Sequence, residues 1–337
     1  MRFVMRKLAN AEGAMLAQAI QAGPQRLRKG VVLTGLMRQW LEVAGYDEVA
    51  VAELAPGDLP ENDAAHAIAA ALCAPGLVVE PPVNGRCNIQ AGAAGLFRAD
   101  VQRLAELNLL DEAITFAALP DRHPVQAGQV VGTVKIIPMA VEALLLQKAT
   151  AIAASVCRLA PYRARRCALI LTRSPLRKAS VLRKTEASMA GRVEARGGIA
   201  LAPQICAHEP GALAEEIGKA LALGADLIMI AGAAAVADRE DVAPTAVMMA
   251  GGRIIRFGMP VFPGNLVCMC EVSDADVLIL PGCAGAPRLN GADWILDRLF
   301  AGEKVTAEDI ARMGAGGLIE AESGAAAAGG ARDQREA

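Results

Sequence analysis

Short apolar runs alternate with longer amphipathic stretches in the second half of the chain. The apolar runs are long enough for strands and lie at residues 167–172, 199–202, 226–231 and 276–280. The stretches between them repeat apolar positions at helical spacing and lie at residues 180–196, 210–223, 241–250 and 289–300. This alternation predicts an α/β fold, a three-layer α/β/α domain with a mostly parallel sheet.

The first half of the chain has a different pattern, in which helix-like and strand-like stretches are mixed. Residues 125–138 alternate apolar and polar positions around Gly128, which predicts strands joined by a turn, and residues 140–158 predict a helix. Pro161 and the charged residues after it then interrupt the apolar pattern, as is typical of a domain boundary. From about Gly314 the chain is rich in Gly, Ala and charge, which predicts disorder. We therefore expect an α+β region over 1–160, an α/β domain over 161–302, and a short helix with a disordered tail over 303–337.

Composition and charge narrow the class of ligand. Aromatic residues make up 3% of the 337 residues, so the chain offers no platform on which nucleic-acid bases could stack. The formal net charge of −2 also lacks the basic excess that binding to a nucleic acid requires. We expect no nucleic-acid partner, whereas a small anionic ligand remains compatible with the sequence.

The eight cysteines include no CxxC pair, and only three histidines exist that could complete a metal site. Most of these cysteines lie inside apolar runs, where a free thiol behaves as a small hydrophobic group in a reducing compartment. Acidic residues interrupt the apolar segments before they reach the roughly 20 residues that a membrane span needs. We expect a cytoplasmic protein without a zinc site, an iron–sulfur site or a membrane partner.

Doubly wound sheets bind ligands beyond the carboxyl ends of their strands, so the loops that follow the predicted strands are the candidate sites. The first loop begins at Thr172 and includes Ser174, several basic residues and Ser180, which could cap the next helix. Hydroxyls, cations and a helix N-terminus together can bind an anion, and Lys184 adds weakly to this prediction. A solvated loop with an ordinary serine cap is the alternative.

The second loop follows the strand that ends at Ala231. Its small residues Gly232, Ala233 and Ala234 would let backbone amides approach a ligand. The nearby Asp238 and Asp241 could hold a divalent cation against phosphate oxygens, although either aspartate could simply cap the next helix.

The third loop follows the strand that ends at Leu280. It contains two prolines and three glycines within residues 280–291, more than a chain reversal demands, which predicts a rigid backbone cradle. The candidate binding residues in it are Pro281, Gly282 and Gly285. An earlier turn has the same character and consists of Pro263, Gly264 and Asn265. Each of these turns taken alone could be a packing turn.

Taken together, these loops resemble the molybdopterin-binding superfamily, whose fold is shared by molybdopterin adenylyltransferase, molybdenum insertase and gephyrin. Residues 231–234 stand where that family has Gly-Gly-Thr-Gly or Gly-Gly-Val-Ser, and residues 240–244 where it has Arg-Asp-Val-Thr-Pro. Residues 263–265 and 280–282 resemble the insertase turns Pro-Gly-Lys-Pro and Leu-Pro-Gly-Asn-Pro. Residues 12–17 and 27–34 are similar, more faintly, to segments of the insertase, a layout found in bacterial molybdopterin-binding proteins that are often fused to a nucleotidyltransferase.

The resemblance implies that the α/β domain binds molybdopterin, and ATP or AMP if it transfers a nucleotide. It implies Asp241 and Asp238 as catalytic residues and as Mg²⁺ ligands, with Glu209 as a third ligand. It also implies a homo-oligomer, and a nucleotidyltransferase or a molybdoenzyme as protein partner.

Two departures from the family pattern bear on catalysis. The family's loop hydroxyl is replaced by Ala233 or Ala234, and the loss of such a donor can cost a few kcal/mol of transition-state stabilisation. Asn265 stands in place of the family's lysine. Three functions stay open: a Mg²⁺-dependent adenylyltransferase or insertase, a non-catalytic pterin-binding module that serves a separate nucleotidyltransferase, and a nucleotide hydrolase of the related competence-damage type.

Overall fold

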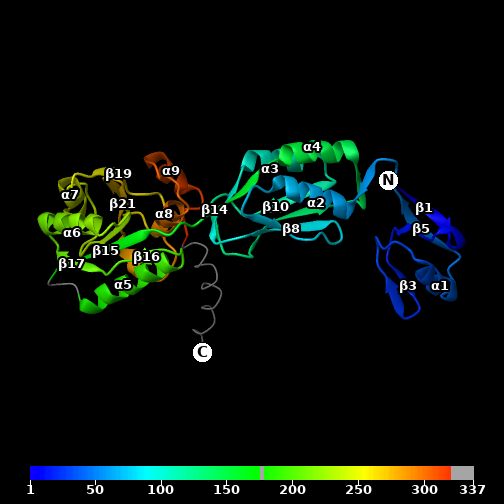
Figure 1. The fold of residues 1–337 in the computed structure, drawn as a ribbon, viewed down its shortest axis with the longest axis horizontal. Helices are drawn as coiled ribbons and strands as arrows, with labels where there is room; N and C mark the ends of the chain where they lie inside the picture. The colour runs from blue at the N-terminus through cyan, green and yellow to red at the C-terminus, as the bar shows by residue number, and fades with distance from the viewer. Residues whose placement is uncertain (175–177, 320–337) are drawn as a thin grey trace, which may run out of the picture. The chain divides into compact units, whose positions relative to one another are not determined.

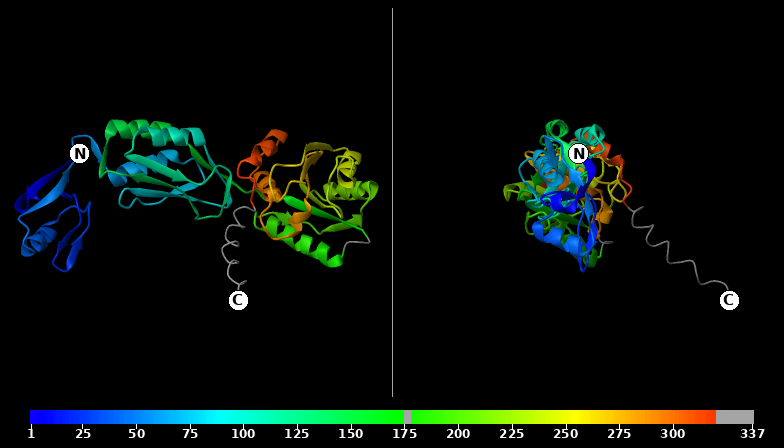
Figure 2. Two further views of the ribbon diagram at one scale, coloured as in Figure 1. Left: turned by 180° about the vertical axis from the view of Figure 1, so that it is seen from behind. Right: turned by 90° about the vertical axis from the view of Figure 1, so that its right-hand side faces the viewer.

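The structure is a computed structural model that describes residues 1–174 and 178–319. The chain divides into two compact units, the first comprising Met1–Ala160 and the second beginning at Pro161. The elements of each unit can be followed in Figure 1 and, from behind and from one side, in Figure 2. No helix within the described residues is long and apolar enough to cross a membrane.

The first unit contains two separate hydrophobic cores, and the smaller one lies at the N-terminal end of the chain. Leu16, Leu41 and Val51 are fully buried in it. Thr34 caps the helix of this core by accepting a 3.3 Å hydrogen bond from the amide of Met37. The elements around this core are the antiparallel strands β1 (Arg2–Lys7), β5 (Glu48–Glu53) and β2 (Met15–Leu16), the hairpin β3 (Ile20–Ala22) and β4 (Gln25–Leu27), and helix α1 (Gly35–Val43).

The larger core of the first unit lies between a four-stranded antiparallel sheet and helices. Along one strand of this sheet Cys87, Ile89 and Ala91 are buried, while the alternate residues Asn88 and Gln90 are partly exposed, so one face of the sheet packs on the core. Antiparallel sheets combined with helices agree with the expected α+β character. The sheet consists of β10 (Ile114–Ala118), β12 (Val130–Ile136), β8 (Arg86–Ala91) and β7 (Leu77–Val79), and its helices are α2 (Glu61–Leu72), α3 (Val101–Leu110) and α4 (Ala143–Ala153). Smaller sheets are formed by β11 (His123–Val125), β9 (Gly95–Ala99) and β14 (Cys157–Pro161), and by β6 (Asp58–Pro60) and β13 (Ala140–Glu142).

The second unit is built on a seven-stranded mixed sheet. Its parallel strands are β15 (Arg166–Arg173), β18 (Leu227–Ala231) and β21 (Ala275–Ile279), with β16 (Ile199–Ala200) and β17 (Gln204–Ala207) on the other side of β15. An antiparallel edge follows, made of β20 (Cys268–Val272) and β19 (Arg253–Phe257). The predicted α/β class is confirmed, whereas the prediction of a mostly parallel sheet holds only in part because of this edge.

Both faces of the sheet are buried. Along β15, Leu169 and Leu171 face one core, and Ala168 and Ile170 face the other. The first core is completed by α5 (Ala179–Glu194) and α8 (Gly291–Phe300), and the second by α6 (Pro210–Ala222) and α7 (Val242–Met249). Figure 1 shows α6 and α7 on one side of the sheet and α5 on the other. Burial on both faces explains why these strands read as continuous apolar runs.

The chain after residue 302 continues the second unit. Helix α9 (Ala307–Ala311) contributes Ile310 to the core, and Met313 is buried beside it. The backbone of Phe262 then bonds to Gly317 and Ile319 at 2.7 and 2.9 Å. The disorder expected from about Gly314 therefore does not apply to residues 314–319, which are held by these contacts; residues 320–337 lie outside the described part.

Candidate functional site

Thr172 joins the carboxyl ends of three parallel strands, β15, β17 and β18. Its side chain is fully buried near the end of β15, and its Oγ1 accepts a 2.7 Å hydrogen bond from the amide of Ala233, which follows β18. The same oxygen lies 2.8 Å from Nδ1 of His208, which follows β17. A buried hydroxyl with two partners is fully satisfied, so Thr172 fixes the relative positions of these strand ends.

His208 was not among the predicted site residues. The sequence pattern did not reveal β17, because this strand has only four residues and they are not all apolar. The position of His208 directly after a strand was therefore not predicted. Its predicted neighbour Glu209 instead occupies the N-cap position of α6, without a side-chain capping bond, and is exposed.

Replacement of Thr172 by valine is expected to lower the free energy of unfolding of the second unit by about 1–3 kcal/mol, because the amide of Ala233 loses its acceptor. Thr172→Ser keeps the hydroxyl and is expected to cost less than about 1 kcal/mol, the value of the lost methyl group. Urea denaturation of both variants tests this. Equal decreases in the free energy of unfolding for Thr172→Val and Thr172→Ser would show that the hydroxyl has no structural role.

The second and third loops together line a cavity of about 90 Å³. It is small beside the roughly 300–1,000 Å³ of sites that enclose a whole organic ligand, so its size suits one anionic group such as a phosphate. The buried Thr185 also borders it, with its hydroxyl donating to the carbonyl of Val181 at 3.0 Å. The predicted binding residues brought together in this lining are Gly232, Ala233, Ala234, Pro281, Gly282 and Gly285.

Other predicted residues take different positions. Helix α5 begins at Ala179 with Lys178 at its N-cap and no side-chain capping bond, so the expectation that Ser180 caps it is wrong. Ser174, Ser180 and Lys184 do not line the cavity between the second and third loops.

The turn formed by Pro263, Gly264 and Asn265 packs against the start of α8 and is also absent from the cavity lining. The amide of Gly291 donates to the carbonyl of Pro263 at 2.9 Å. Gly264 has φ +130°, and a Cβ there would lie 2.6 Å from the nitrogen of Gly291, so only glycine allows this approach. The structure therefore gives this turn a packing role.

The predicted acidic residues are engaged with the backbone of the second loop. Oδ2 of Asp241 accepts hydrogen bonds from the amides of Ala237 at 2.6 Å and Asp238 at 2.9 Å, and these bonds lower the pKa of Asp241. Oδ1 of Asp238 accepts from the amide of Glu240 at 2.8 Å. In residues 1–174 and 178–319, no three His, Cys, Asp or Glu side chains are placed so that they could hold a metal ion. The predicted Mg²⁺ ligands Asp241, Asp238 and Glu209 are therefore not gathered into one site.

The charge of Asp241 is expected to stabilise the second loop only above acidic pH. The pKa of this carboxyl is lowered in the folded chain, so its contribution is complete above its unfolded pKa of about 4 and disappears as the pH falls through the folded value. Asp241→Asn should therefore be less stable than the wild type at pH 7, and this difference should shrink as the pH falls below the unfolded pKa of about 4. A pH series of chemical denaturation measures it, and a difference that stays constant down to pH 2.5 would contradict the assignment.

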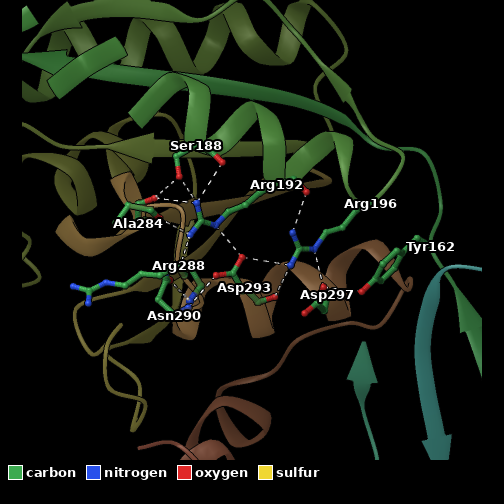
Figure 3. Close-up of polar contacts among 11 residues, drawn as sticks. Tyr162, Ser188, Arg192, Arg196, Ala284, Arg288, Asn290, Asp293 and Asp297 are labelled. Atoms are coloured by element: carbon green, nitrogen blue, oxygen red, sulfur yellow. Dashed lines mark hydrogen bonds and ion pairs between the residues drawn. The ribbon is translucent and has the colours of Figure 1, made fainter. Parts of the chain in front are cut away.

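Arg192 holds the third loop in place from α5. Its side chain is only 8% exposed, and its guanidinium donates to the carbonyls of Ala284, Ala286 and Arg288 at 3.2, 3.0 and 2.9 Å. Its Nε donates to Oδ1 of Asp293 at 2.9 Å, at the start of α8. Figure 3 shows the guanidinium between α5, the third loop and α8. The shape of the cavity wall therefore depends on a buried arginine that sequence reasoning did not single out.

Comparison with known proteins gives fold similarities only. No protein-family model matches the sequence, and no curated protein matches it. Solved structures with a similar fold include molybdenum cofactor biosynthesis protein B (11% identity, 40% of this chain and 87% of the other, TM-score 0.28). The molybdopterin biosynthesis MoeA protein from Pyrococcus horikosii (10% identity, 83% of this chain and 70% of the other, TM-score 0.27) is another. A third is the protein CinA with unknown function from Thermoplasma acidophilum (17% identity, 36% of this chain and 90% of the other, TM-score 0.25). At these TM-scores the similarities support no conclusion about the activity of this chain.

Proposed function

We propose that the second unit binds a phosphorylated pterin of molybdenum-cofactor metabolism, with the phosphate in the cavity between the second and third loops. The observation that supports this most is the position of Thr172, which ties together the strand ends on both sides of β15. The direction in which successive strands are added to the sheet reverses at β15, since β17 lies on one side of β15 and β18 on the other. Open α/β sheets bind ligands beyond the strand ends at such a reversal. The motifs that resemble the molybdopterin-binding superfamily support molybdopterin as this ligand.

Binding without nucleotide transfer is the form of this function that the site supports best. The loop has alanine where the family has a hydroxyl, and the amide of Ala233 already donates to Thr172. The carboxylate of Asp241 accepts two loop amides. The groups that would stabilise charge during adenylyl transfer are therefore replaced or engaged, and we infer a cytoplasmic pterin carrier that serves a nucleotidyltransferase or a molybdoenzyme.

Calorimetric titration of the full chain with molybdopterin, with and without Mg²⁺, tests the proposal. We expect binding that does not depend on Mg²⁺ and no release of pyrophosphate when ATP is added to the complex. The absence of binding would overturn the proposed ligand, whereas pyrophosphate release would assign adenylyl transfer to the chain and overturn the carrier role.

A further inference from the structure

A second cavity, rich in positive charge, lies in the first unit. It has a volume of about 580 Å³, within the roughly 300–1,000 Å³ range of sites for small organic ligands. Four cationic side chains and one carboxylate line it, namely Arg26, Arg28, Lys29, Lys135 and Glu61. The cavity thus has an excess of positive charge, although the whole chain has a net charge of −2.

Most of these cations lack an anionic partner. Within the described residues, Arg26, Arg28 and Lys29 form no ion pair and no side-chain hydrogen bond. Cations that line one cavity without partners repel each other and concentrate anions from solution. The ordinary alternative is a solvated basic surface, which would bind any anion weakly and without preference.

The fourth cation of this cavity, Lys135, is held in position by a hydrogen bond. Nζ of Lys135 on β12 donates to the carbonyl of Asn84 at 2.7 Å, which anchors this cation against a tight turn. That turn is closed by reciprocal bonds between the backbones of Val83 and Arg86 at 2.8 and 3.0 Å. An anchored cation loses less side-chain entropy on binding than a free one, so it favours a defined ligand geometry.

Apolar side chains complete the wall. Met139 is buried, and Ile137 is 56% exposed although it is a large aliphatic residue. An apolar surface beside several cations matches a molecule that carries a flat ring system at one end and phosphates at the other.

We propose that this cavity binds a small organic polyphosphate, meaning a ring-bearing molecule with at least two phosphate groups. The two sources of this chemistry are a nucleoside triphosphate and a nucleotide-linked pterin. This site is separate from the cavity of the second unit, and it does not depend on the function proposed there.

Calorimetric titration of the full chain with ATP, adenosine and inorganic tripolyphosphate tests the proposal. ATP is expected to bind at least about tenfold more tightly than either tripolyphosphate or adenosine. Tripolyphosphate lacks the ring system, and adenosine lacks the phosphates. Equal affinity for ATP and tripolyphosphate, or no binding of ATP, would overturn it. Titration with a dinucleotide of molybdopterin distinguishes the two sources: the tighter ligand is the one that the cavity recognises.

Variants locate the binding. Arg28→Gln and Lys29→Gln remove exposed charges, and each should weaken ATP binding about tenfold, the loss of one charged contact. Lys304→Gln makes the same charge change on the second unit and should leave the affinity unchanged. Weaker ATP binding in this control, or wild-type affinity in both cavity variants, would contradict the assignment.

Discussion

Replacement of Arg192 by methionine is expected to lower the free energy of unfolding of the second unit by about 3–5 kcal/mol, the usual effect of removing one partner of a buried ion pair. The substitution removes the donors of three carbonyls of the third loop and leaves the carboxylate of Asp293 buried, at 7% side-chain exposure. Urea denaturation followed by circular dichroism measures the loss. A loss below 1 kcal/mol would show that the loop keeps its shape without the guanidinium.

The surroundings of Arg192 explain why the effect should be large. Arg196 lies just after the end of α5 and donates to Oδ1 of Asp297 at 2.7 Å, and the hydroxyl of Tyr162 donates to the same oxygen at 2.7 Å. Burial and the charge of Asp297 raise the pKa of Tyr162, so this hydroxyl stays protonated as a donor. Charges in such a network support each other (Figure 3), and removal of Arg192 leaves Asp293 with Arg196 as its cationic partner at the longer distance of 3.5 Å.

An exposed arginine provides the control for this variant. Arg312 pairs with Glu308 at 2.6 Å, with side chains that are 76% and 70% exposed. Arg312→Gln should change the free energy of unfolding by less than about 0.5 kcal/mol, because solvent screens an exposed pair. A similar loss in both variants would mean that burial does not determine the effect.

Gly282→Leu is expected to weaken pterin binding about 100-fold or more, equivalent to about 2.7 kcal/mol. Gly282 borders the cavity, its φ is not in the left-handed region, and a Cβ there meets no atom within 4 Å. The leucine side chain should therefore enter the open space beside the two loops without straining the backbone. Calorimetric titration with molybdopterin measures the affinity.

Gly218→Leu is the matched control for this substitution. Gly218 lies on α6 and is exposed, and its Cβ would also meet no atom within 4 Å. Both variants should keep the thermal stability of the wild type to within a few degrees, and only Gly282→Leu should lose the ligand. Wild-type affinity in Gly282→Leu would place the pterin elsewhere.

The sequence was most informative where burial on both faces produces continuous apolar runs. The strands β15, β18 and β21 and the four helices beside them were predicted within a few residues of their observed bounds. The antiparallel β19 and β20 were missed, because Arg253, Arg256 and Glu271 interrupt their apolar character. Strand pairing across such a break is set by tertiary contacts, which local patterns do not contain.

The candidate site was predictable as a set of loops but not as a set of contacts. The run of small residues indicated that the second and third loops could form a cradle, and both line the same cavity. The sequence could not show that Arg192 reaches Ala286, 94 positions away, or that Thr172 contacts His208. Those contacts join residues from different elements, so they follow from the packing of the unit and have no local signal.

Hydrogen exchange measured by mass spectrometry, on the full chain with and without molybdopterin, tests the central claim most directly. Bound phosphate at the strand ends should slow amide exchange in peptides that cover residues 231–235 and 280–286, and leave the peptides of α6 and α9 unchanged. Unchanged exchange in both loops at saturating molybdopterin would contradict the proposed site.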